Sequence, residues 1–339
     1  MNRFFVCLNV ECLWTLLATF VATSGLVSAN PVDSVLGVSS QVQSTQTGTS
    51  FYLLRDVPYL GADRSEKLDL YVPVSENDVL KPAVVIVHGG GWARGNMRGE
   101  RQVEFAHFMV DEGYIAASIS YKLSQYEGAV WSTRRLSSSF PQNIYDVKSA
   151  VRFLRYHQSS IGVDPERIAM MGGSAGGHLA MLAGLTADSD VLNRGGLYTE
   201  QSNEVSAIVS FYGIPDVRRW GGHIIMDYPE GFDPQRWVDS SGRERTRITR
   251  EWIASDPESW ALASPVEHLS PTSPPFFVTH GTGDTTVPVR HSDRLVDALR
   301  AMGIPHEYHR IRNAPHTYSL KVEGVDLRPA LRAFLNQNL

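Results

Sequence analysis

The chain has 339 residues, of which 42% are hydrophobic and 20% are charged, and its formal net charge is −5. This composition is close to that of an ordinary globular chain, and the length suits one large α/β domain or two small ones. The acidic balance gives no reason to expect a nucleic-acid partner.

The N-terminus has the pattern of a secretory signal peptide. Arg3 precedes an apolar stretch at residues 13–22, and Val27-Ser-Ala29 fits the small-residue rule for cleavage. We therefore expect residues 1–29 to be removed after Ala29 on export to the periplasm or the medium. No stable membrane insertion is expected after that cleavage, and a retained membrane anchor is the alternative.

Both cysteines of the chain, Cys7 and Cys12, lie inside this segment. A cleaved chain would have no disulfide and would rely on its hydrophobic core. Residues 30–50 are polar and small, and they predict a flexible spacer.

From residue 51 to residue 339, strand patterns alternate with helical patterns. Continuous apolar runs, typical of strands that are covered on both faces, lie at residues 83–87, 114–120, 168–171, 205–211 and 276–279. Helical spacing lies between or after them, at residues 144–156, 179–185, 293–302 and 327–335. The alternation predicts one α/β domain with a mostly parallel central sheet and helices on both faces.

Two segments interrupt the alternation, at residues 122–139 and 217–263. Loops of this length in a compact domain are usually functional, so we expect inserted lids or caps. Packed surface insertions without a role in binding are the alternative. The second segment contains four tryptophans, whose flat faces suit sugar rings or aryl groups.

The most informative segment is Gly172-Gly-Ser-Ala-Gly176. It follows the apolar residues 167–171 and precedes residues 178–185, which have helical spacing. A serine between small residues at a strand-to-helix turn is typical of a nucleophile elbow. The tight turn directs Ser174 Oγ beyond the strand end, at a helix N-terminus that favours negative charge. Ser174 is therefore the predicted nucleophile.

A serine nucleophile needs a base and an acid that orients the base, and after this elbow they follow as acid and then histidine. Asp284 leaves the strand pattern at 276–280 in a glycine turn, so it is the predicted acid. A turn aspartate that caps the next helix is the alternative. His316 closes the loop after residues 306–311, which alternate like a strand, and it is the predicted base.

The segment His88-Gly-Gly-Gly-Trp92 follows the first buried strand pattern. Glycine lets the backbone itself face a substrate oxygen, because no Cβ stands in the way. We expect an oxyanion hole formed by the N–H groups of Gly90, Gly91 and Ala175. A brace for this loop is the expected role of the His88 side chain.

Metal and nucleotide chemistry lack their motifs. The sequence has no H-E-x-x-H, no cysteine pair beyond the N-terminal segment and no P-loop. The glycines around Ser174 could suggest a dinucleotide loop, but the serine and the histidine-glycine segment fit a hydrolase better. No metal and no cofactor are therefore expected.

Together these segments resemble the α/β-hydrolase esterases related to hormone-sensitive lipase, and most closely the branch described as bifunctional feruloyl and acetyl xylan esterase-like. The resemblance runs from about residue 67 to residue 335. It rests on Lys67-Leu-Asp-Leu-Tyr-Val-Pro73, His88-Gly-Gly-Gly-Trp92, Phe140-Pro-Gln-Asn-Ile-Tyr-Asp146, Gly162-Val-Asp-Pro-Glu-Arg-Ile168, Gly173-Ser-Ala-Gly-Gly-His-Leu-Ala180, Phe211-Tyr-Gly213, Ala263-Ser-Pro265 and Pro275-Phe-Phe-Val-Thr-His-Gly-Thr-Gly-Asp284. It implies the α/β-hydrolase fold and the same roles for Ser174, Asp284 and His316.

The expected function is that of a secreted serine carboxylic ester hydrolase that works through an acyl-enzyme. The expected partner is a small-molecule or polysaccharide ester, with acetyl or feruloyl groups as the acyl part. Trp92 and Trp220 are the candidate substrate-binding residues. The alternatives are an amide hydrolase of the same fold, either an exopeptidase or an arylformamidase, and a non-catalytic binding protein.

Overall fold

The computed structural model describes residues 36–75, 79–127, 135–137, 139–193, 195–219, 236–238, 244–246 and 257–339. The predicted signal peptide, residues 1–29, lies outside these ranges, as does Trp220.

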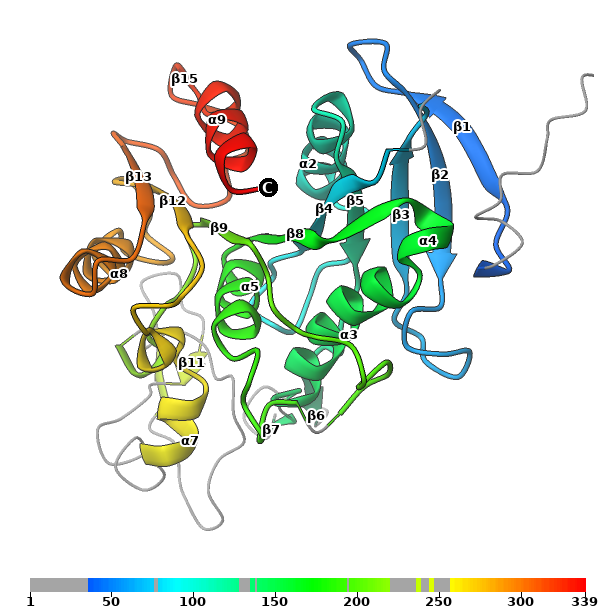
Figure 1. Cartoon of the computed structure of the whole chain (residues 1–339). Helices are drawn as coiled ribbons and strands as arrows, with labels where there is room; N and C mark the ends of the chain where they lie inside the picture. The colour runs from blue at the N-terminus through cyan, green and yellow to red at the C-terminus, as the bar shows by residue number, and fades with distance from the viewer. Residues whose placement is uncertain are drawn as a thin grey trace, which may run out of the picture.

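A nine-stranded sheet forms the centre of the molecule (Figure 1), in the order β1-β2-β3-β5-β4-β8-β9-β12-β13. The strands from β5 to β13 in that order are parallel neighbours, whereas β1, β2 and β3 join the sheet by antiparallel pairing. Their bounds are β1 (Ser40–Ser44), β2 (Ser50–Val57), β3 (Leu68–Pro73), β4 (Lys81–Val87), β5 (Ile115–Ile119), β8 (Val163–Gly173), β9 (Ala207–Phe211), β12 (Phe276–Gly281) and β13 (His306–Ile311). The prediction of a mostly parallel sheet is confirmed.

Helices cover both faces of this sheet (Figure 1), as predicted. One face is covered by α3 (Gln142–Tyr156), α5 (Ala175–Leu185) and α8 (Arg290–Ala301), and the other by α2 (Glu100–Asp111) and α9 (Arg328–Asn338). The smaller elements are β6 (Gln125–Glu127), β7 (Arg135–Ser137), α4 (Gln158–Ile161), η2 (Val217–Arg219), β10 (Arg236–Val238), β11 (Glu244–Thr246), α7 (Pro257–Leu262), η3 (Pro265–His268), β14 (Lys321–Val322) and β15 (Val325–Asp326).

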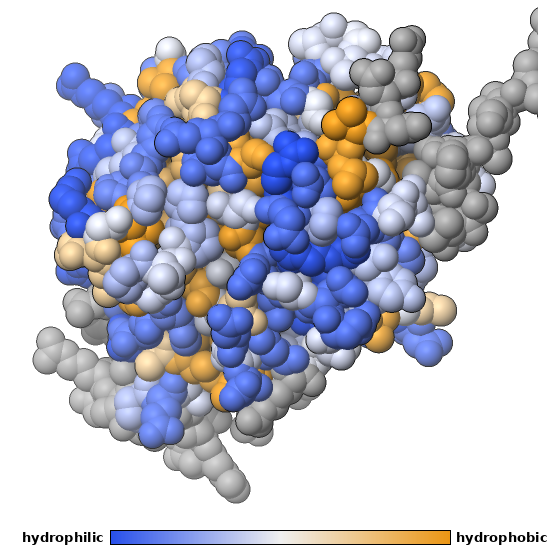
Figure 2. Space-filling view, in the orientation of Figure 1, coloured by the Kyte–Doolittle hydropathy of each residue, from blue (hydrophilic) through white to orange (hydrophobic). Residues whose placement is uncertain are grey.

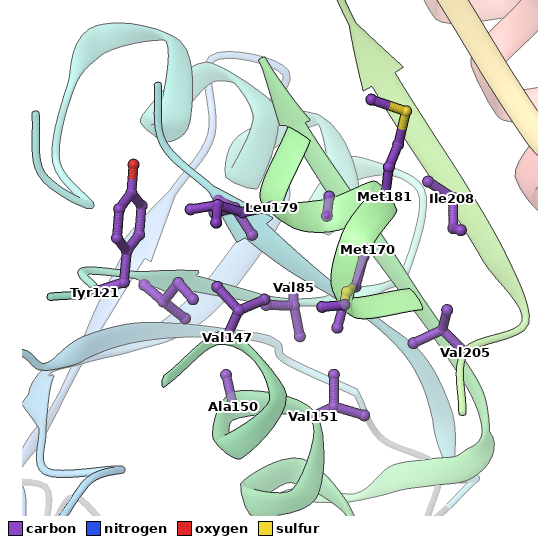
Figure 3. Packing of buried hydrophobic residues seen from close by; sticks show 14 of the residues in the cluster. Val85, Tyr121, Val147, Ala150, Val151, Met170, Leu179, Met181, Val205 and Ile208 are labelled. Carbon is purple, nitrogen blue, oxygen red and sulfur yellow. The ribbon is translucent and has the colours of Figure 1, made fainter. Parts of the chain in front are cut away.

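Most of each central strand is apolar, because successive side chains point alternately into two hydrophobic layers, one on each face of the sheet. In β4, Val85 belongs to the core cluster under α3 and α5, and Ile86 belongs to the cluster under α2 and α9. Figure 3 shows Val85 and Met170 of the sheet facing Val147 and Val151 of α3. Two packed layers thus stabilise the domain.

The outer surface in the view of Figure 2 is mostly hydrophilic, and apolar residues form small scattered patches on it. Such patches are ordinary on globular proteins. Within the described residues, no helix combines the length and the hydropathy that crossing a membrane requires.

The predicted spacer over residues 30–50 is wrong over its last part. Strand β1 pairs with β2 from Ser40↔Leu54 to Ser44↔Ser50 and forms the edge of the sheet. The turn after β1 is tied to the end of α2, where the Thr45 and Thr47 hydroxyls both donate to Asp111 Oδ1 at 2.6 Å. Backbone pairing and hydroxyl contacts order this segment. The prediction was based on polar composition, which indicates neither of them.

The two predicted insertions each contain a two-stranded hairpin, β6–β7 in the first and β10–β11 in the second. Most of the second insertion lies outside the described residues, so a lid or cap there stays a prediction. Its last tryptophan, Trp260 of α7, is 1% exposed and belongs to the core. Trp260 therefore packs the fold and offers no face to a ligand.

The register of the parallel strands aligns their carboxyl ends in a row. Val87 of β4 pairs with Gly172 of β8, and Gly173 pairs with Phe211 of β9. Phe211 pairs in turn with Thr279 of β12, two residues before β12 ends. The loops after β4, β8, β9, β12 and β13 therefore leave the sheet along one edge, where open α/β sheets bind their ligands.

Candidate active site

Ser174 lies between the end of β8 and the start of α5, in a strained turn. Its φ is 58° and its ψ is −125°, a conformation that residues with a Cβ seldom adopt. The neighbours must be small, because a Cβ on Gly172 would lie 2.3 Å from Gly176 O. A Cβ on Gly176 would lie 2.1 Å from Val87 O. The geometry is that of the predicted elbow.

The structure brings the three predicted triad residues together. His316 Nδ1 donates to Asp284 Oδ2 at 2.6 Å, and His316 Nε2 lies 3.0 Å from Ser174 Oγ. Because a carboxylate only accepts, Nδ1 carries the proton and Nε2 is left to accept from the serine hydroxyl. The side chain of His316 is 11% exposed and that of Asp284 is fully buried, so the arrangement opens to solvent at its serine end.

The Asp284 carboxylate is surrounded by donors. Its Oδ1 accepts from the N–H groups of Thr286 and Val287, each at 2.8 Å, and its Oδ2 accepts from His316. Nε2 of His280 lies 3.2 Å from the same Oδ2. Burial acts to raise the pKa of Asp284, but hydrogen bonds from His280, His316 and the backbone outweigh it and hold that pKa well below 3.8. The group is therefore ionised at neutral pH.

The loops that carry Asp284 and His316 pack backbone against backbone. A Cβ on Gly281 would lie 2.1 Å from Ala314 O, and a Cβ on Gly283 would lie 2.6 Å from Asn313 O. Asn313 itself has a positive φ of 58°. The glycines before Asp284 are thus explained by the approach of the histidine loop, which brings acid and base within hydrogen-bond distance.

The glycine loop after β4 packs against the elbow. A Cβ on Gly89 would lie 3.3 Å from Ser174 Cβ and 2.8 Å from Gly173 O. Gly90 has a φ of 119°, and its carbonyl turns back to accept from Arg94 N at 3.1 Å. This conformation is open only to glycine. The loop thus packs on the serine turn through Gly89. Gly90 and Gly91 follow directly in the chain, and their role as oxyanion donors stays a prediction.

The third predicted donor, Ala175, is the first residue of α5. The first N–H groups of a helix have no partner within the helix and carry its positive dipole end. An N–H at this position, directly after Ser174, suits an anionic oxygen on the serine adduct.

Trp92 does not lie where a substrate-binding residue would. Its ring is 1% exposed, and its Nε1–H donates to His178 Nδ1 at 3.1 Å. His178 Nε2 donates in turn to Ala263 O at 2.8 Å, and burial lowers the pKa of His178 to about 4. The prediction that Trp92 binds substrate is wrong, because its indole joins the elbow helix to the segment after α7.

His88 braces the glycine loop, as predicted. Its Nδ1–H donates to Gly89 O at 2.7 Å, and its ring stacks on Tyr121 with 4.3 Å between centroids. Burial lowers the pKa of His88 to about 4, so the ring is neutral at pH 7. A hydrogen bond from Tyr121 to His88 O at 3.0 Å holds the same corner.

Sequence reasoning did not single out two residues that support the triad. Tyr212 follows β9, and its ring lies 4.8 Å from the His316 ring, while its hydroxyl donates to Tyr318 O at 2.8 Å. His280 contacts Asp284 from the end of β12. Both belong to quoted motifs, Phe211-Tyr-Gly213 and His280-Gly-Thr-Gly-Asp284, but spacing alone does not show which side chains turn toward the site.

A pocket of about 300 Å³ lies beside the glycine loop and touches both His88 and Gly95. Its other walls come from the residues after β5 and from the loop before β3, and they carry hydroxyl, amide and charged groups: Ser65, Glu66, Ser120, Lys122 and Gln125. The residues that line this pocket do not include Ser174 or His316. In the described ranges, no cluster of three or more His, Cys, Asp or Glu side chains could hold a metal ion.

Several relatives in sequence are esterases or carboxylic ester hydrolases by name. The chain is 30% identical over 272 residues to a probable carboxylic ester hydrolase, LipM, of Mycobacterium tuberculosis, covering 78% of this chain and 56% of LipM. It is 28% identical to the esterase LipC of the same organism, covering 84% of this chain and 66% of LipC. The chain thus spans between about half and two thirds of the length of these relatives.

Solved structures share the fold. A bifunctional GH43-CE protein of Bacteroides eggerthii superposes with a TM-score of 0.64 at 26% identity, over 84% of this chain and 37% of that one. A thermophilic esterase of Thermogutta terrifontis gives 0.59 at 22% identity, over 88% of this chain and 90% of that one.

The family model BD-FAE matches residues 68–299, from β3 to the last turn of α8. The match contains the glycine loop, the serine elbow and Asp284. Because it extends over more than half of the sequence, the chain belongs to the BD-FAE family of α/β-hydrolases.

Proposed function

We propose that this protein is a serine carboxylic ester hydrolase in which Ser174 is the nucleophile, His316 the base and Asp284 the residue that orients the base. The observation that carries the proposal is the hydrogen-bonded chain from Ser174 Oγ through His316 to a buried, ionised Asp284. Ser174 also has a strained backbone at the start of α5, which distinguishes this hydrogen-bonded chain from an ordinary polar contact.

The chemistry follows from the proton positions. Ser174 Oγ attacks the acyl carbon while His316 Nε2 takes the hydroxyl proton, which produces a tetrahedral intermediate with an anionic oxygen. Collapse of that intermediate expels the alcohol, which takes the proton from His316. Water then attacks the acyl-enzyme with His316 again as base, and this step releases the carboxylic acid and restores Ser174.

The anionic oxygen would be stabilised by the N–H groups of Gly90, Gly91 and Ala175. These groups come from the loop after β4, which packs on the serine turn through Gly89, and from the first residue of α5. One such donor is typically worth about 3 kcal/mol of transition-state stabilisation. Asp284 remains ionised throughout and stabilises the imidazolium that forms.

We further propose an acyl ester of a carbohydrate as the substrate, with acetyl or feruloyl as the acyl group. A solved structure with the same fold, from gut microbiota, is a carbohydrate esterase, and it supports this class.

Covalent labelling tests the nucleophile. An organophosphonate should add one label to the protein, and peptide mapping should find it on Ser174. Ser174→Ala should abolish both the label and hydrolysis of p-nitrophenyl acetate. Ser206→Ala is the matched control, because Ser206 Oγ donates to Glu166 O before β9 begins, at the opposite end of the sheet. Full activity of Ser174→Ala, or a label on another residue, rules the assignment out.

A substrate panel tests the class of bond. Acetylated xylan, feruloyl esters, p-nitrophenyl esters and aminoacyl anilides should be assayed together with the wild-type protein. Ester hydrolysis with no release of the anilides is the expected result. Faster turnover of the anilides would identify an amide hydrolase instead.

We also propose that the protein is exported and that cleavage follows Ala29. The support is the sequence pattern of residues 1–29 alone. Mass spectrometry of the protein secreted by its natural host should find Asn30 as the first residue. An intact N-terminus, or retention in the membrane fraction after a salt wash, would contradict this.

A further inference from the structure

A second histidine reaches the acid of the triad. His280, the fifth residue of β12, is fully buried, and its Nε2 lies 3.2 Å from Asp284 Oδ2. This is the same oxygen that accepts from His316 Nδ1 at 2.6 Å. One carboxylate oxygen therefore faces an imidazole on each side, and the reaction described above uses only one of them.

The tautomer of His280 follows from its other contacts. Nε2 lies 2.8 Å from Val287 O, and a carbonyl oxygen can only accept, so Nε2 carries a proton. That proton is shared between Val287 O and Asp284 Oδ2. On the opposite side of the ring, Nδ1 lies 2.7 Å from Ser292 Oγ on α8. The ring is thus held at both nitrogens, and its donor is directed at the acid.

The other carboxylate oxygen is held as well. Asp284 Oδ1 accepts from the backbone of Thr286 and Val287. Rotation of the carboxylate would break contacts on both oxygens at once. His280 adds a donor to Oδ2, the oxygen that accepts from His316. The backbone donors contact only Oδ1.

We propose that His280 is a positioning residue of the active site: its Nε2–H holds Asp284 Oδ2 in line with His316 Nδ1. The inference rests on the proposed function, because it assigns the acid the role of orienting His316. It predicts that removal of this donor lets the carboxylate rotate, so that His316 loses its fixed direction toward Ser174. Misplacement of a catalytic group by about 1 Å can cost about 100-fold in rate.

If His280 only filled the core, its variants should behave differently. Its Nε2 would be satisfied by Val287 O, and any polar replacement of similar size would serve equally well. Two substitutions distinguish the positioning role from the packing role. The amide of glutamine reaches the position of Nε2, and the amide of asparagine reaches that of Nδ1. His280→Gln keeps two N–H donors for Val287 O and Asp284 Oδ2, whereas His280→Asn keeps only the contact with Ser292.

The experiment measures kcat and KM for p-nitrophenyl acetate together with the melting temperature. We expect His280→Gln to remain within about threefold of wild-type kcat, and His280→Asn to lose 10- to 100-fold in kcat with KM unchanged. Ser292→Ala, which leaves Nε2 in place, is the control and should resemble His280→Gln. Equal kcat in the Gln and Asn variants, or losses that follow the melting temperature, would overturn the proposal.

Two measurements keep this test separate from the proposed function. In wild-type protein labelled with ¹⁵N-histidine, NMR should find His280 protonated at Nε2, and an unprotonated Nε2 would overturn the inference without any variant. The downfield proton of His316 Nδ1–H should persist in His280→Gln and broaden or vanish in His280→Asn, with no substrate present. If Ser174→Ala is inactive and His280→Asn has wild-type activity, the proposed function stands and the positioning role of His280 is contradicted.

Discussion

Two of the regions that bury charged side chains give them opposite kinds of hydrogen-bond partner. Behind the sheet, Lys148, Arg152 and Arg155 of α3 direct their charges into the loop between α5 and β9. At the carboxyl ends of the strands, the triad carboxylate Asp284 is buried and surrounded by N–H groups.

The cations of α3 bind neutral oxygens of that loop. Arg152 donates to Leu197 O, Gly195 O and Asn203 Oδ1 of the loop. Arg155 donates to two carbonyls of the loop and to Pro165 O of β8. Lys148 donates to Thr186 O and to Asn193 Oδ1. Burial lowers the pKa of both arginines, and that of Lys148 to about 7. These contacts fix an irregular segment whose carbonyls would otherwise lack partners.

The partners of Asp284 differ, because two of them are imidazoles. An amide N–H keeps its proton, whereas an imidazole can take or release one near neutral pH. A buried charge next to carbonyl oxygens therefore supports the fold, and a buried charge next to histidine supports proton transfer. The comparison predicts that substitutions in the two regions separate activity from stability.

The largest expected effect is on activity, in Asp284→Asn. The amide of asparagine cannot accept from Thr286 and Val287 with its oxygen and also accept from His316 with its nitrogen. His316 should then adopt the other tautomer, and kcat should fall by up to about 10⁴-fold. Steady-state kinetics and circular dichroism check this. Asp293→Asn on α8, which removes only a partly exposed ion pair with Arg310, should keep its activity, and the reverse pattern would mean that the acid is misassigned.

Removal of a buried cation should affect stability instead. Arg152→Met leaves several buried oxygens without a donor, so the free energy of unfolding should fall by about 3 kcal/mol. The kcat of the folded variant should match that of the wild type. Denaturant unfolding with Arg300→Met, an exposed α8 arginine, as control gives the comparison. A strong loss of kcat in folded Arg152→Met would show that the two regions are coupled.

The smallest expected effect is a pH dependence due to Lys148. Its pKa of about 7 in the fold is below its ordinary 10.5, so between these values the unfolded chain binds more protons than the folded one. The contribution of this group to stability therefore rises with pH from about 7 to 10.5. In Lys148→Met this rise should be absent, whereas Lys321→Met should retain it. Unfolding curves at pH 7, 8 and 9 measure the slope, and equal slopes in all three proteins would contradict the prediction.

Much of the site could be predicted because its parts are local. The elbow requires glycine at 172 and 176, and the structure explains each by a backbone atom that a Cβ would strike. The expected order of Asp284 and His316 after Ser174 follows from the chain path of one fold. Loops at one edge of a parallel sheet meet wherever the register aligns the strand ends, and apolar runs are sufficient to locate those strands.

Other features could not be predicted, because their signal is not local. Strand β1 is polar, and only its pairing with β2 makes it part of the sheet. Trp92 stands beside the glycine loop in sequence, yet its indole turns into the core toward His178. His280 looks like any histidine at the end of a buried strand until Asp284 and Val287 fold back over it.

Residue type and order along the chain are sufficient to predict the fold class and the serine turn. They also predict Asp284 and His316 as the two partners, which the structure places in one hydrogen-bonded chain with Ser174. Contacts between distant side chains depend on tertiary packing, and they include the second histidine on Asp284, the direction of Trp92 and the cations that hold the loop between α5 and β9. The reason is physical. Backbone preferences and hydrophobic periodicity act over a few residues, whereas a hydrogen bond within 3 Å depends on the packing of segments that lie far apart in the chain.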